Sequence, residues 1–394
     1  MKKTIKLAVV AVLALGATSA FATNGSNMMA TGAKATAMGG TGIGMSHGAE
    51  SALVNPALIT SVKDTEISFG GTIFMPTVST DGGSGGMVSS DSDAKLNVIP
   101  EVSIATKMND SLYLGIGMWG TAGMGTDYRT STNPGTMNMV TNLQLMQFGV
   151  PVAYKINNFS VAVTPLLQYG ALDMNFMNPM TGTLNGNGVS QNLKFGYNLG
   201  AAYTMSGLTL GATYVSQIDM EYNNQFANLG MADKLSTPAT IGAGVSYAFG
   251  ANTIAFDYKQ IKWEDAKGYQ DFNWKNQSVM ALGYQYTAKT WAGRIGYNYA
   301  KSPIEAVALG TTPASMTGAT LANMFNLVGF PAIVESHMTV GGSYNLSERT
   351  AVDLAYVYSP ETAAKFDIMT AGGPSTIETK HSQTALSAQL SYKF

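Results

Sequence analysis

The sequence has no cysteine, few charged residues and, beyond residue 22, no long apolar run. Without cysteine, a disulfide scaffold and a cysteine nucleophile are both excluded. After residue 22, no stretch approaches the roughly 18 unbroken apolar residues that a membrane-spanning helix requires. Charged residues make up 12% of the chain, about half of the roughly 25% typical of a soluble domain. The formal net charge of -2 argues against a general nucleic-acid surface.

The first 22 residues have the pattern of a secretory signal peptide. Three lysines precede the apolar run from Leu7 to Ala17, and Ala20-Phe21-Ala22 provides the small residues that signal peptidase recognises. We therefore expect residues 1–22 to be removed and the mature chain to begin at Thr23.

The last residues of the chain alternate between apolar and polar side chains. Leu386, Ala388, Leu390, Tyr392 and Phe394 share one side of an extended chain, and polar residues occupy the other. A terminal aromatic residue suits the closing strand of an outer-membrane barrel. We expect this strand to engage the barrel-assembly machinery, and the barrel to contact outer-membrane lipid and lipopolysaccharide.

Similar alternating stretches recur along the chain and predict about fourteen strands. They lie near residues 64–78, 97–108, 111–122, 137–156, 159–176, 191–204, 207–221, 236–249, 252–264, 273–287, 290–300, 335–346, 350–358 and 381–394. An even number is what a bacterial single-chain barrel with both termini in the periplasm requires. The predicted fold class is all-β: a transmembrane antiparallel β-barrel over residues 64–394, in the outer membrane of a Gram-negative bacterium.

The connections between these strands alternate in length. Every second one is a tight turn: Asn109-Asp110, Asn157-Asn158, Met205-Ser206, Gly250-Ala251, Ala288-Lys289 and Leu346-Ser347-Glu348. Longer links, rich in Gly, Asn, Thr and Pro, lie near 79–96, 123–136, 177–190, 222–235, 265–272, 301–334 and 359–380. Short periplasmic turns and long extracellular loops are typical of outer-membrane barrels.

Strand parity predicts which charged side chains face the lumen. In the strand near 290–300, Arg294 lies on the opposite face from Trp291 and the apolar residues that alternate with it. Lys194 and Lys259 likewise alternate with aromatic and aliphatic neighbours in their strands. An Arg or Lys facing lipid at mid-bilayer costs roughly 2 to 4 kcal/mol. These three side chains are therefore predicted to be lumen cations.

A barrel of this width cannot fill its interior with wall side chains alone. Residues 23–63 precede the first strand, lack alternation and contain a run of small residues at 32–42. Irregular backbone is tolerated inside a lumen because it does not touch lipid. We predict that residues 23–63 form a plug, or hatch; the alternative is a disordered periplasmic tail.

The candidate plug ends in Asn55-Pro56-Ala57, preceded by the glycine-rich run Gly39-Gly40-Thr41-Gly42. This arrangement resembles the N-terminal hatch of the FadL family of outer-membrane transporters for long-chain fatty acids, toluene and other hydrocarbons. The resemblance extends along the whole chain and includes the fourteen-strand plan and the C-terminal Tyr392-Lys393-Phe394. It implies passive, energy-independent uptake of hydrophobic compounds, without a cofactor or metal.

In that family a kink in the third strand opens the barrel wall, so that the substrate leaves laterally. The third predicted strand here contains Gly115, Gly117 and Gly120, and glycine permits a bend or bulge. These glycines are candidates for such a kink, although glycine on a lumen face also makes room for a plug.

One departure from the family concerns the substrate's head group. Members that carry fatty acids have basic side chains in the inner pocket, whereas the fifth strand here has none at residues 170–176. An uncharged substrate fits this strand better. Lys194, Lys259 or Arg294 could still meet a carboxylate from other strands, so both substrate classes stay open.

Methionine is abundant, with 24 in the chain, and several lie in the candidate plug: Met28, Met29, Met38 and Met45. Thioethers adapt to apolar ligands of different shape, so these residues are candidates for the substrate path; the alternative is simple gap filling. The longest link carries an apolar stripe with helical spacing, formed by Leu321, Met324, Phe325 and Val328. Such a helix either presents a landing patch for lipophilic compounds or folds down onto the barrel rim.

Two other functions are compatible with a barrel. A lipid hydrolase would need a serine and histidine pair, and the three histidines are His47, His337 and His381. A general porin would need an open aqueous lumen lined by charge, whereas this chain has few charges and a candidate plug. We therefore predict a transporter that is not an enzyme, with hydrophobic small molecules as its partners.

Overall fold

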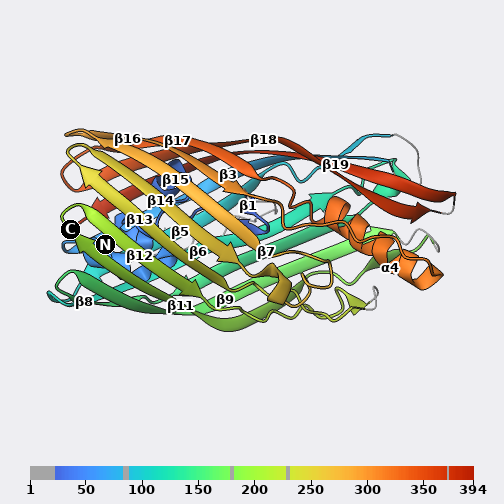
Figure 1. Ribbon diagram of the computed structural model, residues 1–394, viewed down its shortest axis with the longest axis horizontal. Coiled ribbons are helices and arrows are strands. Elements are labelled where there is room, and N and C mark those ends of the chain that lie inside the picture. The colour runs from blue at the N-terminus through green and yellow to red at the C-terminus, as the bar shows by residue number, and fades with distance from the viewer. Residues whose placement is uncertain (1–22, 83–87, 178–181, 228–230, 371) are drawn as a thin grey trace.

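The computed structural model describes residues 23–82, 88–177, 182–227, 231–370 and 372–394, so the predicted signal peptide at 1–22 lies outside the described residues. In these ranges the chain forms one closed antiparallel barrel with fourteen wall strands (Figure 1). They are β3 (Thr65–Gly82), β5 (Asn97–Lys107), β6 (Leu112–Asp127), β7 (Val140–Gly149) with β8 (Val152–Ile156) as one interrupted strand, β9 (Phe159–Met177), β11 (Ser190–Met205), β12 (Leu208–Val215), β13 (Thr240–Phe249), β14 (Asn252–Ile261), β15 (Gln277–Thr287), β16 (Trp291–Ala300), β17 (Ser336–Asn345), β18 (Thr350–Thr370) and β19 (Gly373–Lys393).

The barrel closes because the last strand pairs with the first. Residues of β19 from Ile377 to Lys393 lie opposite β3 in an antiparallel register that joins Lys393 to Glu66. Neighbouring strands otherwise follow chain order, joined at one end by short turns and at the other by longer loops, except that β18 and β19 stay paired as far as Thr370 and Gly373. We call these two ends the turn rim and the loop rim. The prediction of an all-β closed barrel of fourteen strands is confirmed.

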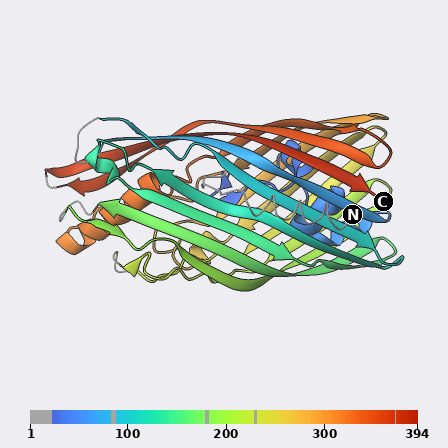
Figure 2. The same cartoon turned by 180° about the vertical axis from the view of Figure 1, so that it is seen from behind.

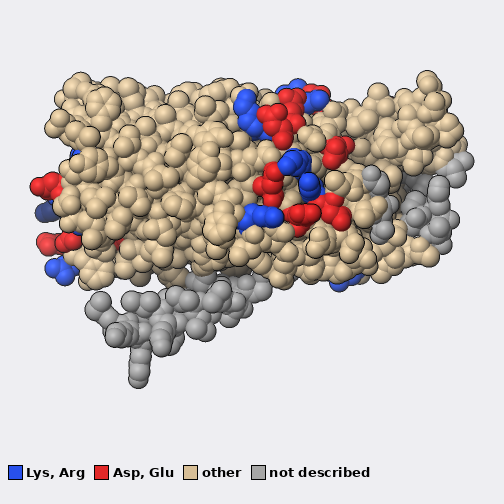
Figure 3. All heavy atoms as spheres, turned by 90° about the horizontal axis from the view of Figure 1, so that it is seen from below, with Lys and Arg blue, Asp and Glu red and all other residues tan. Residues whose placement is uncertain are grey.

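The wall has an apolar outer face. Phe195 is 81% exposed and Ile295 is 57% exposed, whereas the alternate residue Arg294 is only 7% exposed. Figure 3 shows a broad uncharged belt between charged side chains at the turn rim and a charged band nearer the loop rim. An apolar belt of this kind is what a barrel presents to the hydrocarbon core of a bilayer.

Several predicted boundaries are wrong, beginning with those of the last predicted link. The predicted link 359–380 is instead a continuation of β18 and β19, whose pairing runs on through Lys365↔Glu378. Beyond the lipid level the alternation reverses: Phe366 and Ile377 are buried, while Lys365 and Glu378 form an ion pair of 3.8 Å on the outer face. The reversed polarity resembles a polar loop in sequence.

The tight turn predicted at Met205-Ser206 lies one residue later, at Ser206-Gly207, where both residues have positive φ. In addition, β12 ends at Val215 and β13 begins at Thr240, so the predicted strands 207–221 and 236–249 are too long at the loop rim. Only isolated bridges, such as Ile218↔Thr237, continue their pairing.

Several short elements cover the loop rim. They are β4 (Ser90–Asp91), η3 (Pro134–Thr136), β10 (Leu184–Gly186), η5 (Trp263–Asp265), α4 (Pro313–Met324) and the π-helix η6 (Phe325–Gly329). Among the described residues, no helix is both long and apolar enough to cross a bilayer.

The N-terminal segment, residues 23–63, lies inside the ring of strands in both ribbon views (Figures 1 and 2). Its elements are β1 (Thr23–Asn24), β2 (Asn27–Met28), α2 (Ala33–Ala37), η1 (Gly48–Glu50), α3 (Ser51–Val54) and η2 (Pro56–Ser61). Most of its side chains are buried, including Met38, Asn55 and Ile59. The segment therefore fills a lumen that the wall side chains leave open.

Candidate functional site

Wall glycines give the N-terminal segment room to pack. A Cβ added at Gly283 would lie 2.6 Å from the carbonyl oxygen of Met38, and one at Gly211 would overlap the carbonyl of Ile43. The same close approach occurs at Gly200, Gly244 and Gly296, which lie on β11, β13 and β16. Because these strands lack side chains at the contact, the backbone of the segment lies directly against the barrel wall.

Asp257 of β14 binds the glycine-rich turn of the segment. Its carboxylate accepts hydrogen bonds from the backbone N–H groups of Gly42 and Ile43, both at 2.7 Å, and of Gly44 at 3.2 Å. Asp257 is 3% exposed. Three converging N–H groups compensate a buried carboxylate that has left water, so this wall residue fixes the turn.

The Asn55-Pro56-Ala57 motif has a structural role in this segment. The Asn55 side chain donates to the carbonyls of Ile43 (2.8 Å) and Ala201 (3.1 Å) and accepts from the N–H of Ala57 (3.2 Å). It thereby caps η2, whose first residue is Pro56, a residue that needs no N–H partner there. One side chain thus joins the glycine-rich turn at Ile43 and the start of η2 to β11.

An apolar cavity of about 150 Å³ lies between the segment and the wall. The segment contributes Met28, Met29, Leu53 and Val54, and the wall contributes residues of β6, β7, β12, β13, β14 and β15. The structure thus brings two of the four predicted plug methionines to one cavity. Met38 packs instead against Ala255 and Gly283, and Met45 packs beside it.

Lys259 is the cationic side chain in the lining of this cavity. Its ammonium is 3.5 Å from the carbonyl oxygen of Met29, and no carboxylate lies within ion-pair distance of it among the described residues. The other two predicted lumen cations lie elsewhere. Arg294 donates to Gln285 and Ser343, both at 2.6 Å, near the turn rim, and Lys194 of β11 lines neither large cavity.

The third wall strand is irregular beside the cavity. The register of β6 against β7 shifts between Gly120 and Ala122, so Thr121 is an extra residue, and Thr121 lines the cavity. The N–H of Gly123 donates to the carbonyl of Ser26 at 3.0 Å, which links the bulge to the start of the segment. A bulge bends a strand and disrupts its ladder, so this part of the wall differs from the rest.

The three predicted kink glycines lie in and just before this irregular stretch. Gly115 N–H donates to the carbonyl of Pro151 (2.9 Å), at the interruption between β7 and β8. A side chain at Gly117 would overlap the indole of Trp119, and one at Gly120 would overlap Ile99. Among the contacts described here, these glycines make room for wall side chains rather than for the segment.

The predicted apolar stripe of the longest loop is buried at the loop rim. Phe325 and Val328 are fully buried, Met324 is 8% exposed and Leu321 packs against the same cluster, which includes Trp263 and other loop aromatics. The helix also ends at Met324, where a π-helical turn follows, so the single predicted helix is two elements. Of the two alternatives, folding onto the rim agrees with the structure.

The three histidines make contacts that do not favour a hydrolase. His47 bonds to the carbonyl of Thr41 (2.7 Å), His381 to the carbonyl of Pro331 (2.8 Å) and His337 to the side chain of Gln383 (3.2 Å). Each described imidazole contact is thus to an amide or carbonyl group. None of these is the serine contact that nucleophilic catalysis needs.

Sequence reasoning missed Asp257 and the wall glycines that hold the segment. The sequence offers one signal for the glycines: they occur at inward positions of several successive strands. Strand parity predicts that Asp257 faces the lumen with Lys259, but the sequence gives no signal for its three partners, which lie 213 to 215 residues away in the chain.

A closed barrel with an apolar belt, whose lumen holds its own N-terminal residues, defines the class of outer-membrane β-barrels. Residues 8–254 match the model of the family described as outer membrane protein transport protein (OMPP1/FadL/TodX). The chain belongs to this family. It is therefore an outer-membrane β-barrel that transports hydrophobic compounds, and not an enzyme.

Solved structures share the fold. A Pseudomonas aeruginosa FadL homologue has a TM-score of 0.73 at 13% identity, covering 94% of this chain and 100% of that chain. The P. putida toluene transporter TodX gives 0.67 at 16% identity, covering 93% and 99%, and the Ralstonia pickettii toluene transporter TbuX gives 0.65 at 15%, covering 93% and 99%. At these identities the likeness concerns the fold alone.

A curated relative covers a smaller part of the chain. An uncharacterized protein in the phosphoenolpyruvate carboxykinase gene 5' region of Chlorobium limicola is 37% identical over 114 residues. The match covers 28% of this chain and 55% of that protein. The chain thus spans about half the length of this relative.

Proposed function

We propose that this protein allows passive, energy-independent uptake of long-chain fatty acids or hydrocarbons across the outer membrane. The observation that carries the proposal is the apolar cavity formed by Met28, Met29 and the wall, inside a barrel whose outer belt is apolar. Transfer of apolar surface from water contributes about 25 cal/mol per Å². That gradient suffices to draw a lipophilic molecule in without an energy source.

In this proposal residues 23–63 act as the hatch and residues 1–22 as the signal peptide. The contacts of Asp257 and Asn55 support a hatch that stays folded against the wall while its first residues move. The tip, residues 23–28, contacts the wall through the Ser26 hydroxyl bond to Tyr269 (2.9 Å), the backbone bond from Gly123 to Ser26 and the pairing of Asn27 with Ala122. Among the described residues no ion pair holds it. Movement of the tip would connect the aromatic cluster at the loop rim with the cavity.

We further propose that the substrate leaves laterally through the wall at β6. The cavity reaches the bulge at Thr121, whose buried hydroxyl has no hydrogen-bond partner among the described residues. The interruption at Pro151 weakens the same region, because proline cannot donate to the ladder. Exit into the outer leaflet would spare a lipophilic molecule the aqueous periplasm.

The head group of the substrate depends on Lys259. Solved proteins of the same fold are described as toluene transporters, which favours uncharged compounds. The Asp257 carboxylate lines the same cavity and attracts the Lys259 ammonium, but it is held by three backbone N–H groups and forms no ion pair with Lys259 among the described residues. An ammonium in this position favours a carboxylate substrate, because a buried charge is stabilised by an opposite one. We propose that Lys259 selects between the two classes, and that the cavity accepts either apolar body.

Uptake measurements test the function and the head group together. Cells lacking the gene are complemented with the wild-type protein, with Lys259→Met, or with Lys155→Met as a control, and are given labelled palmitate, hexadecane or toluene, with and without an uncoupler. We expect wild-type uptake of at least one compound, unaffected by the uncoupler. Loss of palmitate uptake alone in Lys259→Met would assign fatty acids, whereas equal uptake of all three compounds with and without the gene would refute transport.

A general porin is the alternative that a conductance measurement separates. The intact protein should show little steady conductance in planar bilayers, and a variant lacking residues 23–60 should conduct. Large steady conductance in the intact protein would favour a porin. We also propose that the outer belt contacts outer-membrane lipid and lipopolysaccharide, and that β19 is recognised by the barrel-assembly machinery.

A further inference from the structure

A second cavity lies at the turn rim and differs in character from the first. It has a volume of about 410 Å³ and is lined mainly by polar and charged residues, among them Arg349 and Lys393 near the rim and Lys34 and Asp353 further in. It shares no lining residue with the apolar cavity. We call it the polar vestibule; part of the N-terminal segment, residues 32–50, separates it from the apolar cavity.

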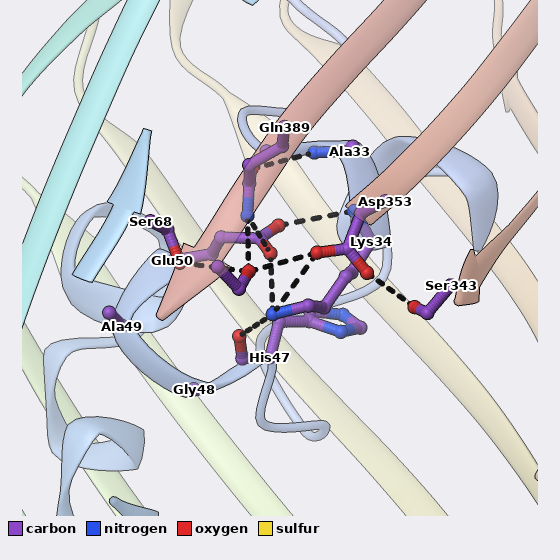
Figure 4. A network of polar contacts seen from close by, with 12 residues as sticks. Ala33, Lys34, His47, Gly48, Ala49, Glu50, Ser68, Ser343, Asp353 and Gln389 are labelled. Carbon is purple, nitrogen blue, oxygen red and sulfur yellow. Dashed lines mark hydrogen bonds and ion pairs between the residues drawn. The ribbon is translucent and has the colours of Figure 1, made fainter. Parts of the chain in front are cut away.

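Lys34 is the centre of the contacts that hold this part of the segment (Figure 4). Its ammonium is 3.0 Å from Glu50, on the segment itself, and 3.8 Å from both Glu66 of β3 and Asp353 of β18. It also donates to the carbonyl of His47 at 3.3 Å. One cation therefore bridges the segment and two strands of the wall.

The carboxylates around Lys34 are themselves held in place. Glu50 accepts from the Gln389 amide at 2.7 Å, and Asp353 accepts from the hydroxyls of Ser391 (2.9 Å) and Ser343. Their side chains are 8% exposed or less, and that of Lys34 is 14% exposed. Burial alone lowers the pKa of Lys34, but the three carboxylates outweigh it and raise the pKa above its ordinary value, so the ammonium stays charged.

Removal of this charge would leave three buried carboxylates facing one another. Breaking a buried ion pair by removing one partner is strongly unfavourable, because the remaining charges have neither water nor a counter-ion. The carboxylates would separate or admit water, and two of them belong to the wall while the third belongs to the segment. The segment would thus lose the ion pairs that join it to Glu66 and Asp353 at the boundary between the two cavities, while Glu50 keeps its hydrogen bond to Gln389 of β19.

We propose that Lys34 is the positioning residue that seals the lumen against hydrophilic solutes, by holding residues 32–50 against Glu66 and Asp353. This inference rests on the proposed function and deepens it: the barrel passes lipophilic molecules because water-soluble ones are stopped here. The specificity of the channel then depends on a charge that no substrate touches.

The absence of native cysteine allows a direct test. Lys34→Cys is reconstituted in planar bilayers and then treated either with a methanethiosulfonate carrying an aminoethyl group or with a neutral methanethiosulfonate of similar size, both of which can enter through the vestibule. We expect ion conductance in Lys34→Cys to exceed that of the wild type by at least about tenfold. The aminoethyl reagent should close it again, and the neutral reagent should not.

Matched variants separate this seal from a merely structural effect. Lys34→Arg keeps the charge and should remain closed, and Lys107→Met, which breaks the exposed ion pair with Asp110 at the same rim, should also remain closed. A closed Lys34→Cys channel, equal rescue by both reagents, or an open Lys107→Met channel would overturn the inference. Uptake of palmitate or toluene by the same preparations tests the transport proposal independently, so the two can fail separately.

Discussion

Replacement of Asp257 by alanine should release the glycine-rich turn of the N-terminal segment. The carboxylate accepts three N–H groups, from Gly42, Ile43 and Gly44, at 2.7, 2.7 and 3.2 Å. Each hydrogen bond to a charged group contributes about 1.5 to 3 kcal/mol, but loss of one acceptor is not additive over three donors. We expect a local cost of about 3 to 5 kcal/mol, since three buried amides are left without partners.

Hydrogen exchange measures this local free-energy cost at the backbone amides of the turn itself. In detergent-solubilised protein, amides 42–44 should exchange about 100 to 5000 times faster in Asp257→Ala, the factor that corresponds to about 3 to 5 kcal/mol. Asp257→Asn keeps one oxygen acceptor and should give a smaller increase. Asp110→Ala is the control, because its carboxylate contacts Lys107 at the exposed turn rim and not the N-terminal segment. Unchanged exchange at 42–44 in Asp257→Ala would refute the assignment of Asp257 as the residue that fixes the turn.

Three further predictions concern the same segment. Asn55→Ala removes two bonds to carbonyls and a cap, and should cost about 2 to 3 kcal/mol, visible as faster proteolysis of residues 40–60. Gly211→Ala places a Cβ against a segment carbonyl and should cost about 1 to 3 kcal/mol in the same assay, whereas Gly318→Ala, with open space around it, should change nothing. Burial lowers the pKa of His47 from 6.5 to about 3, so the segment is most stable above pH 6.5 and loses stability as the pH falls toward 3. Faster proteolysis at pH 5 than at pH 7, reduced in His47→Gln, is the expected result; the raised pKa of Glu50 opposes it, and an identical pH dependence in both proteins would contradict it.

The barrel could be predicted because lipid imposes a strict rule on every wall strand. Where one face meets hydrocarbon and the other the lumen, side chains must alternate, and the alternation of Trp291, Ile295 and Tyr297 with Arg294 was readable for that reason. The strand count was also readable, since β7 and β8 form one alternating stretch despite the break at Pro151.

The same rule fails where the barrel leaves the lipid. The extension of β18 and β19 keeps its hydrogen-bond ladder but turns apolar residues inward, as at Phe366 and Ile377, and polar residues outward. The rule that apolar residues face outward therefore predicts a polar link at residues 359–380, where the two strands in fact continue. The turn at Ser206-Gly207 was displaced for a simpler reason: positive φ suits Gly207, which fixes the turn one residue later.

The candidate site was only partly predictable. The methionines of the segment and Lys259 were recognisable as types of residue that face a lumen, but their meeting was not, since Met29 and Lys259 are 230 residues apart in the chain. Met38 and Met45 have the same sequence signal as Met28 and Met29, yet they pack against the wall away from the apolar cavity. Which methionine lines the cavity depends on the fold of the segment, which has no regular pattern.

Two kinds of contact hold the N-terminal segment against the barrel wall. Backbone against glycine fixes its position at Gly211 and Gly283 without charge, because a missing Cβ lets two backbones touch. Charge fixes it at Lys34 and Asp257, where carboxylates of the wall bind groups of the segment. The first kind would be present in any close-packed plug, but the second makes the seal depend on particular residues. The proposed hatch, which stays in place while its first residues move, needs both kinds of contact, since close packing against glycine supplies no ion pair or side-chain hydrogen bond to particular groups of the segment.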